Sequence, residues 1–598
     1  MSYVKLKDSD IMKKIGFIEK YKRASNAADG SGLDANANVD IKNIATMEAE
    51  INKDINIQIN RKIMQLKIES LFGKELSDEY IRQLEDHEIY AHDETSLKPY
   101  CVSVTMYPLL LDGMIGLGGE SKAPQHLQSF CGNFVNMVFA IASQFAGAVA
   151  TVEFLNYLDY FARKDFGEDY LENENALKIL IENIQHVVYS INQPAAARGY
   201  QSVFWNISIY DKEYFEAMFG NFVFPDNSKP NWDTVNGLQK LFMKWFNAER
   251  SKSILTYPVV TAACLTSEGK LKDHEFEDFI SQELSEGNSF FVFMNDNPHA
   301  LSSCCRLKNN IEDQINEFSY TLGAGGVSTG SLNVITLNMN RLFQDKRNIR
   351  EEISKIHKYQ IAYRKITEEY LEAGLLSVYN AGFISIDKQY LTIGINGLVE
   401  AAEYLNMNIG NNKDYIDFVS STLKEISDEN KIASKKYGYK FNTEFVPAEN
   451  LGVKFAKWDK NDNYVVNRDC YNSYIYLVED EEISPIDKII LHGRKTSEFL
   501  DGGSALHLNL DQYPNKEAFR KLLNVCAVEG CEYFCFNIKI TICRDCKNID
   551  KRTRYSCDKC GSKEVDHATR VIGYLKNIAS FSEGRKIEAS KRFYNKDA

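Results

Sequence analysis

Hydrophobic and polar positions follow two different periods in turn along the chain. Short segments rich in β-branched and aromatic residues predict strands at residues 101–107, 202–210, 258–265, 290–294, 332–337 and 439–446. Helical spacing of apolar residues predicts helices at 341–373, 398–407 and 413–436, with further helical stretches up to about residue 193. Because helices follow strands in regular alternation, we expect an α/β fold with parallel strands.

Two segments stand apart from this alternation. Helical patterns at residues 1–24 and 42–72, separated by a polar linker at 27–40, predict an N-terminal arm without a core of its own. Residues 123–152 carry no formal charge but contain Asn, Gln and His side chains, so we expect a helix buried in protein rather than in lipid. The chain is accordingly divided into a helical N-terminal arm (1–74), a main α/β unit (75–540) and a cysteine-rich C-terminal region (541–598).

Composition narrows the class of protein. A chain of 598 residues with 44% hydrophobic content buries a large core. Its net charge of −13 argues against a nucleic acid as main partner, because such a partner calls for a basic face. The N-terminus lacks the apolar segment of a secretory signal. Thirteen unevenly spaced cysteines in such a chain indicate a reducing, cytoplasmic location, where cysteine serves metal or redox chemistry.

Four of these cysteines form two CxxC pairs near the C-terminus. Cys543 and Cys546 are separated by ten residues from Cys557 and Cys560, which is the spacing of a closed tetrahedral zinc site. Two disulfides or thioredoxin-like redox motifs are the alternatives; the reducing compartment disfavours the first and the missing βαβ context the second. Four thiolates leave no open coordination position, so the zinc is expected to be structural.

Ten residues after the last of these cysteines the chain reads Arg570-Val-Ile-Gly573-Tyr-Leu575. A glycine Cα lies between an amide nitrogen and a carbonyl, and both groups delocalise an unpaired electron. The alternative is a glycine in a tight turn that needs positive φ. The hexapeptide resembles the glycyl-radical loop shared by anaerobic ribonucleotide reductases and pyruvate formate-lyase-like enzymes, and its position after a four-cysteine cluster favours the radical interpretation.

A buried glycyl radical needs a relay atom to reach a substrate, and a cysteine thiol suits this role because S–H and glycyl C–H bonds have similar strength. Cys304 and Cys305 lie between two strand-like segments and precede the glycine-rich stretch 323–331. Buried structural thiols are the alternative interpretation of this pair. With Gly573 in the same chain, the pair is the best relay candidate.

From about residue 75 to 598 the chain resembles the anaerobic (class III) ribonucleoside-triphosphate reductases. The matching features are the segment Ile89-Tyr-Ala-His92-Asp93, Cys101, the Cys305-Arg306 step, Val334-Ile-Thr-Leu-Asn338, Pro447-Ala-Glu449-Asn450, the four zinc cysteines and the Gly573 loop. The resemblance implies a ten-stranded α/β barrel with a finger loop through its centre, near residues 300–331. It places the thiyl radical on Cys305 at the loop tip and Cys101 on the first barrel strand. Pyruvate formate-lyase relatives usually lack the zinc cluster.

The same resemblance implies a mechanism. Gly573 as a radical takes a hydrogen atom from Cys305, and the thiyl radical removes the ribose 3′-hydrogen. Glu444 could shuttle the proton that releases the 2′-hydroxyl as water, although an ordinary strand carboxylate is the alternative interpretation. Formate-using members carry an asparagine where this chain has Ser331, so we expect instead that Cys101 and one of Cys304 and Cys305 supply the electrons, restored by a thioredoxin- or glutaredoxin-like protein.

The resemblance also implies partners. We expect a radical-SAM iron–sulfur activase, a ribonucleoside triphosphate substrate, a nucleotide effector and a homodimer whose interface involves the helix at 125–152. The zinc and the glycyl radical are the only cofactors expected, with neither a membrane nor a nucleic acid as partner. The short N-terminal arm is too small and polar for the ATP-binding regulatory domain of most cellular members. The rival functions are a glycyl-radical lyase or dehydratase and a non-enzymatic zinc-ribbon binding protein.

Overall fold

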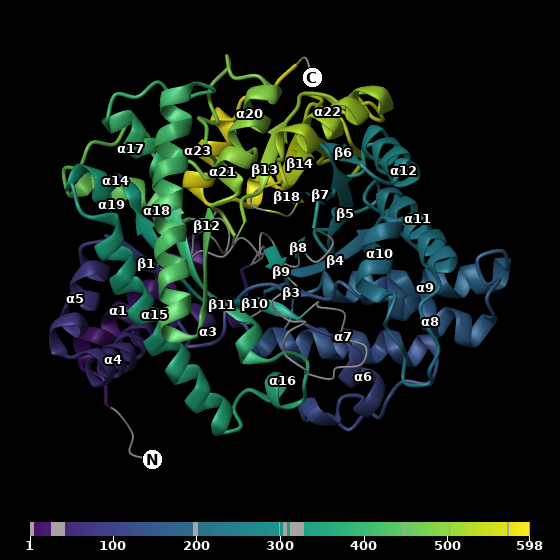
Figure 1. Cartoon of the computed structure of the whole chain (residues 1–598), viewed down its shortest axis with the longest axis horizontal. Helices are drawn as coiled ribbons and strands as arrows, with labels where there is room; N and C mark the ends of the chain where they lie inside the picture. The colour runs from purple at the N-terminus through teal and green to yellow at the C-terminus, as the bar shows by residue number, and fades with distance from the viewer. Residues whose placement is uncertain are drawn as a thin grey trace.

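The computed structural model describes residues 5–24, 42–194, 201–297, 300–302, 308–310, 328–445, 450–501, 503–570, 573 and 575–596, the two short segments at 300–302 and 308–310 by their backbone alone. Strands lie at the centre of the molecule and helices surround them (Figure 1). Among the described residues, no helix is both long enough and apolar enough to cross a membrane.

One large sheet organises the chain. Ten of its strands form a continuous path in the order β12-β11-β10-β2-β3-β4-β5-β7-β14-β13, while β1 pairs with β10 and β6 with β5. The strands are β1 (Ile89–Ala91), β2 (Cys101–Ser103), β3 (Val149–Ala150), β4 (Trp205–Tyr210), β5 (Val259–Ser267), β6 (Lys270–Leu271), β7 (Phe291–Asn295), β10 (Thr329–Asn338), β11 (Gln389–Asn396), β12 (Lys440–Phe445), β13 (Leu506–Asn509) and β14 (Tyr533–Asn537).

The path consists of two parallel halves that close into a barrel. One half consists of five parallel strands, β2, β3, β4, β5 and β7. The other half consists of the parallel strands β10, β11 and β12 together with the parallel pair β13 and β14. The halves meet antiparallel at β2/β10 and at β7/β14. At the two ends of the path, Glu444 of β12 forms a parallel bridge to Gly503, just before β13, and the Phe445 N–H donates to the Gly503 carbonyl at 3.3 Å. The predicted ten-stranded α/β barrel is therefore confirmed.

Helices cover the outside of this barrel. In the first half they are α1 (Asp8–Arg23), α3 (Ile44–Ile51), α4 (Lys53–Phe72), α5 (Lys74–Glu85), α6 (Tyr107–Asp112), α7 (Leu127–Gln144), α8 (Phe154–Phe166), α9 (Glu174–Ile191), α10 (Lys212–Phe219), α11 (Trp232–Glu249) and α12 (His274–Ser285). In the second half they are α14 (Met339–Gln344), α15 (Ile349–Glu372), α16 (Ser377–Asn380), α17 (Leu398–Tyr404), α18 (Lys413–Tyr437), α19 (Leu451–Asn461), α20 (Pro485–Leu491), α21 (Arg494–Ser497), α22 (Lys516–Glu529) and α23 (Glu583–Lys591). Aromatic packing joins the two layers: Phe134 of α7 lies 5.6 Å from Trp205 of β4, centroid to centroid.

Two smaller sheets accompany the barrel. The antiparallel sheet β16-β15-β17-β18 contains β15 (Ile540–Cys543), β16 (Ile549–Asp550), β17 (Val565–Arg570) and β18 (Leu575–Asn577), and it carries the C-terminal cysteines. The hairpin of β8 (Ala300–Ser302) and β9 (Lys308–Asn310) lies in the middle of the view in Figure 1. This hairpin follows β7 and begins at residue 300, where the sequence predicts the start of the finger loop.

The segment 123–152 differs from its prediction. The helix α7 ends at Gln144 and is followed by the two-residue strand β3. The Gly147 N–H donates to the Tyr100 carbonyl at 2.6 Å, and the Val149 N–H donates to the Phe204 carbonyl at 2.8 Å. Tertiary pairing with the strands on both sides therefore overrides the helical preference of these residues.

Two other boundaries were also wrong. The strand expected at 101–107 ends at Ser103, and α6 begins at Tyr107. The helix expected at 341–373 is divided into α14 and α15, with Lys346 between them at φ 54°. A left-handed residue ends the first helix and changes the direction of the chain.

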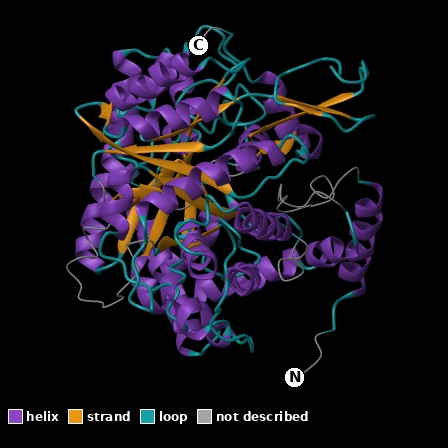
Figure 2. Cartoon of the chain, turned by 90° about the vertical axis from the view of Figure 1, so that its right-hand side faces the viewer, coloured by secondary structure: helices purple, strands orange, loops and turns teal. Residues whose placement is uncertain are grey.

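The N-terminal helices lie at one edge of the molecule, beside the lower part of the barrel (Figure 2). Helix α4 packs against α15 of the barrel layer. Its Arg61 guanidinium donates two hydrogen bonds to the Glu94 carboxylate, at 2.8 and 2.6 Å. The division of the chain at residues 74 and 540 stays a prediction.

A buried carboxyl group gives the fold a pH dependence. Glu153, between β3 and α8, is fully buried and accepts hydrogen bonds from the Met106 N–H at 2.9 Å and the Thr105 hydroxyl at 3.3 Å. Burial raises the pKa of Glu153 from 4.5 to about 8. Between these two values the folded protein therefore holds a proton that the unfolded chain has released, and stability falls as pH rises.

We expect Glu153→Gln to remove this contribution. The two proteins should have the same thermal midpoint near pH 4.5. Between pH 4.5 and pH 8 the free energy of unfolding of the variant relative to the wild type should rise by at most ~1.4 kcal/mol for each pH unit, so its thermal midpoint should exceed that of the wild type by a growing margin. The measurement is thermal unfolding of both proteins over a pH series, in which other titrating groups cancel in the difference. A difference between the two midpoints that does not change with pH would contradict the assignment.

Candidate active site

Strand alternation decides which side chains face the inside of the barrel. On β12, Phe441 packs against His357 of the outer helix α15 with 4.4 Å between ring centroids, and Thr443 accepts a hydrogen bond from Asn430 of α18 at 2.8 Å. Successive side chains point to opposite faces of a strand. Asn442 and Glu444 therefore point into the barrel.

Cys101 faces the same interior from β2. Cys101 pairs with Ser331 of β10, and the residue as a whole is 8% exposed. Its thiol accepts a hydrogen bond from the Ala148 N–H at 3.4 Å. A Cβ on Gly147 would lie 2.5 Å from the Cys101 sulfur, so the close approach of these two segments requires glycine. The Ser331 hydroxyl is hydrogen-bonded to the Thr392 hydroxyl at 2.8 Å. Cys101 and Glu444 thus lie on the interior faces of strands from the two halves.

Gly573 is buried in the turn between β17 and β18. A Cβ built on it would meet no described atom closer than the Cε2 of Phe291, at 4.0 Å, and its φ is not positive. Phe291 is on β7 and pairs with Cys535 of β14 across the antiparallel junction of the barrel. The glycine therefore lies beside this junction, and within the described part of the chain neither a positive φ nor a close contact demands a glycine here.

Arg570 holds this turn in place. Its guanidinium donates to the Ser289 hydroxyl at 3.0 Å, to the Ser289 carbonyl at 2.9 Å and to the Gly573 carbonyl. It also lies over the Phe291 ring at 4.9 Å. Arg570 is only 1% exposed, and burial lowers its pKa. Its polar partners in the described part of the chain are carbonyl and hydroxyl oxygens rather than a carboxylate.

Two further side chains attach the turn to the rest of the structure. Asn537, the last residue of β14, accepts the Arg570 N–H at 3.0 Å and the Thr569 hydroxyl at 3.1 Å, and it donates to Asn509 of β13 at 2.8 Å. Arg592, after α23, donates to the Arg570 carbonyl at 2.8 Å and forms a buried ion pair with Glu588 at 2.6 Å. Barrel strands and the C-terminal helix therefore both hold the turn.

The four C-terminal cysteines come together as predicted. The sulfur atoms of Cys543, Cys546, Cys557 and Cys560 all lie within 4.8 Å of one another. Two sulfur pairs, Cys543 with Cys560 and Cys546 with Cys557, are 3.6 Å apart. Four sulfur ligands at this separation fit a tetrahedral zinc ion and leave no open coordination position. Cys543 ends β15, which pairs with β17, the strand leading to Gly573.

Cys304 and Cys305 lie outside the described residues. The strands β8 and β9, which flank them in sequence, are described and pair antiparallel, and β8 lies against β5 and β7. The proposed roles of Gly573, Cys305, Cys304, Cys101 and Glu444 stay predictions. Sequence reasoning missed Asn537 and Arg592, and a lone asparagine or arginine offers no local signal that could reveal their contacts with the turn.

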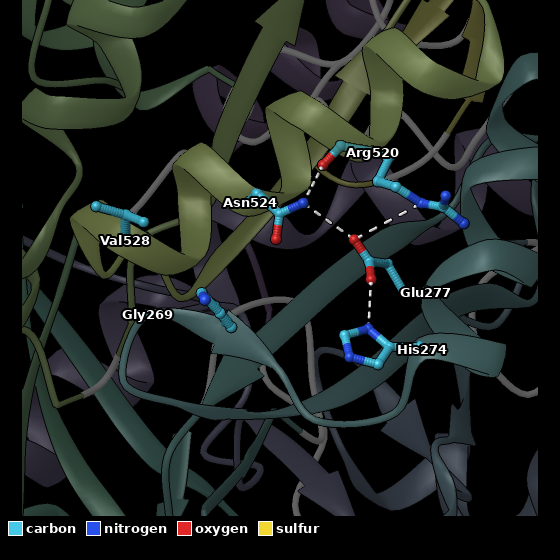
Figure 3. A pocket seen from close by; sticks show the side chains of 7 residues that line it. Gly269, His274, Glu277, Arg520, Asn524 and Val528 are labelled. Atoms are coloured by element: carbon cyan, nitrogen blue, oxygen red, sulfur yellow. Dashed lines mark hydrogen bonds and ion pairs between the residues drawn. The ribbon is translucent and has the colours of Figure 1, made fainter.

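A separate hollow of about 500 Å³ lies in the outer helix layer, between α12 and α22 (Figure 3). Its central carboxylate, Glu277, accepts hydrogen bonds from Asn524 at 3.0 Å and contacts His274 at 3.2 Å. Arg520 lies 3.9 Å from the same carboxylate. Glu277 is thus surrounded by polar partners, and the hollow belongs to the packing of two helices rather than to the barrel interior.

The family model of anaerobic ribonucleoside-triphosphate reductase matches residues 48–594. The chain belongs to this reductase family. No curated protein sequence matches the chain.

Solved reductase structures share the whole architecture. One structure described as an anaerobic ribonucleotide reductase is 25% identical, with a TM-score of 0.85 over 99% of this chain and 93% of that chain. The Thermotoga maritima anaerobic ribonucleotide reductase with glycerol in its active site is 26% identical, with a TM-score of 0.83 over 96% and 94%. The same enzyme in complex with dATP and CTP is 26% identical, with a TM-score of 0.81 over 98% and 100%. The reductase family predicted from the sequence is confirmed.

Removing one zinc ligand tests the cysteine cluster. We expect Cys546→Ser and Cys557→Ser to lose bound zinc and to fail to form a glycyl radical, because the metal fixes the small sheet that leads to Gly573. The barrel should keep its far-UV circular dichroism. Metal analysis and EPR are the measurements.

Cys131→Ala, a buried cysteine of α7 outside the cluster, is the matched control and should keep the zinc. Full zinc retention in both cluster variants would contradict the assignment.

Proposed function

We propose that this reductase converts ribonucleoside triphosphates to deoxyribonucleoside triphosphates with a radical stored on Gly573. The family match over most of the chain favours ribonucleotide reduction over a glycyl-radical lyase or dehydratase and over a zinc-ribbon binding protein. One observation supports the radical position most strongly. Gly573 is held beside the barrel by buried contacts, although no described atom would lie closer than 4.0 Å to an added Cβ, so the chemistry of the glycine Cα–H accounts for the residue better than the described contacts do.

The first steps move a hydrogen atom twice. The Gly573 Cα radical takes the thiol hydrogen of Cys305, which restores the glycine and leaves a thiyl radical. The thiyl radical takes the 3′-hydrogen of the ribose, which restores the thiol and leaves a substrate radical. Each step breaks one S–H or C–H bond and forms another of similar strength. Zinc, held by the four cysteines, supplies no step and stabilises the sheet beside the turn.

The next steps remove the 2′-hydroxyl and reduce the ribose. Glu444, on the interior face of β12, supplies the proton with which the hydroxyl leaves as water. Cys101 and the member of the Cys304/Cys305 pair that does not carry the thiyl radical then supply two electrons and become a disulfide, so that the relay thiol keeps the 3′-hydrogen. An external dithiol protein of the thioredoxin or glutaredoxin type reopens that disulfide through a mixed-disulfide step. Transfer of the 3′-hydrogen back to the substrate regenerates the thiyl radical.

The relatives support the expected ligands. The Thermotoga maritima enzyme has been solved with dATP in its specificity site and with dATP and CTP together. We infer that this chain likewise binds a ribonucleoside triphosphate substrate and a nucleotide effector. We also propose that a radical-SAM iron–sulfur activase generates the radical and that the protein is a homodimer. The cysteine usage of the chain supports a cytoplasmic location.

Gly573→Ala tests the radical position. The variant should fold with an unchanged thermal midpoint, because the new methyl group has room. After anaerobic incubation with an activase and S-adenosylmethionine it should give no EPR doublet and no deoxynucleotide. The activated wild-type enzyme, exposed to air, should be cut at Gly573.

Gly16→Ala, in helix α1 with no described atom near the added Cβ, is the control and should keep both the doublet and the activity. A normal doublet from Gly573→Ala would contradict the proposal.

Cys101→Ser tests the reductant. The variant should form the glycyl radical normally but make no multiple turnovers with a thioredoxin or glutaredoxin system, because the disulfide that carries the electrons needs Cys101. The measurement is deoxynucleotide formed per radical, with formate alone and with the dithiol protein alone. Multiple turnovers of the wild-type enzyme on formate without any dithiol would refute the proposed reductant.

A further inference from the structure

Asn442 is a side-chain amide of the barrel interior that has no hydrogen bond at either end within the described structure. Asn442 of β12 is fully buried, and neither its carbonyl oxygen nor its amide nitrogen has a hydrogen-bond partner in the described structure. Buried side-chain amides are normally satisfied by protein or by ordered water, and leaving both ends unpaired costs free energy. Such a group in a native protein calls for a partner that arrives from outside the chain.

The surroundings of Asn442 indicate where that partner lies. Asn442 is on the interior face of β12, two residues before Glu444, because Phe441 and Thr443 contact the outer helices. Its register partner on β11 is Thr392. The Thr392 hydroxyl is hydrogen-bonded to Ser331, which pairs with Cys101 on β2.

Thr392 pairs in register with Val334, and its hydrogen bond to Ser331 runs diagonally to the neighbouring strand. Asn442 therefore lies on the same interior face as the cysteine assigned to reduction and, on its own strand, as the glutamate assigned to proton transfer. If those two residues act on the ribose, the ribose lies against this face. This step rests on the proposed function.

We propose that Asn442 binds the ribose of the substrate nucleotide. A carboxamide presents one acceptor and two donors, and a ribose hydroxyl needs both an acceptor for its hydrogen and a donor for its oxygen. The substrate thus satisfies both ends of the side chain, and the free energy lost in the empty site is recovered on binding. Asn442 is a binding residue that discriminates by hydrogen bonding, since an analogue lacking the hydroxyl leaves the amide unpaired again.

Asn442→Leu separates this role from a structural one. Leucine has a similar volume and removes the unsatisfied amide, so the variant should unfold at the same temperature as the wild type or higher. It should still form the glycyl radical. KM for the ribonucleoside triphosphate should rise at least tenfold, and the rise in thermal midpoint that the nucleotide causes in the unactivated wild type should be lost in the variant.

Asn430→Leu is the matched control. Asn430 is buried in α18, and its side chain is hydrogen-bonded to His357 and Thr443 on the outside of the barrel. That variant should unfold at a lower temperature than the wild type, yet keep the nucleotide-dependent shift and the wild-type KM. We therefore expect Asn442→Leu to lose nucleotide binding without losing stability, and Asn430→Leu to lose stability without losing nucleotide binding.

Wild-type KM and nucleotide shift in Asn442→Leu would overturn the proposal and assign the site to ordered water. If Asn442→Leu does not fold, Asn442→Ala, which only removes atoms, decides by the same nucleotide shift. The shift is measured without activation, so it is independent of the radical. An enzyme that binds nucleotide but yields no EPR doublet would refute the radical at Gly573 while leaving Asn442 to be judged by binding alone.

Discussion

The position of Gly573 depends on one buried cation. The Arg570 guanidinium remains charged at any pH the protein meets, yet it is 1% exposed and bonded to carbonyl and hydroxyl oxygens. Removing a charge from water is costly, so these dipoles and the Phe291 ring must remain in place to stabilise it. Because Arg570 also donates to the Gly573 carbonyl three residues along, the turn cannot move without breaking the contacts of the charge.

The contacts that hold the Gly573 turn also attach the C-terminal region to the barrel. The apolar clusters after residue 540 are small, one around Ile540, Ala568 and Leu575 and one around Phe581 and Ala589. Clusters of this size contribute little burial, and the remainder of the stability must come from elsewhere. The cysteine cluster supplies it on one side of the turn, and Asn537 and the Arg592–Glu588 pair on the other. The cysteine cluster, a barrel strand and the C-terminal helix thus hold one turn from three directions.

The features that short sequence segments encode could be predicted, whereas those that depend on tertiary pairing with distant strands could not. The cluster of four cysteines was predicted from spacing alone, and β4, β5 and β7 from runs of apolar, β-branched and aromatic residues. Strands β11, β13 and β14 were not located, although the family resemblance required ten strands. The two residues of β3 were assigned to a helix, because only pairing with β2 and β4 makes them a strand. Neither Asn442 nor Asn537 has a local signature, since the face on which each lies follows from barrel register.

The strand number itself explains why the barrel interior has room for more than its own side chains. An eight-stranded barrel has an interior just wide enough for its own side chains to fill, and a ten-stranded barrel is wider. Strands of parallel sheets are usually apolar on both faces, yet here the interior carries Asn442, Asn509 and Asn537. Asn537 and Asn509 are bonded to each other, and Asn537 also to the Gly573 turn, whereas Asn442 has no hydrogen bond in the described structure. Polar groups buried in a wide interior need polar partners. The Gly573 turn provides them for Asn537, and the proposed substrate would provide them for Asn442.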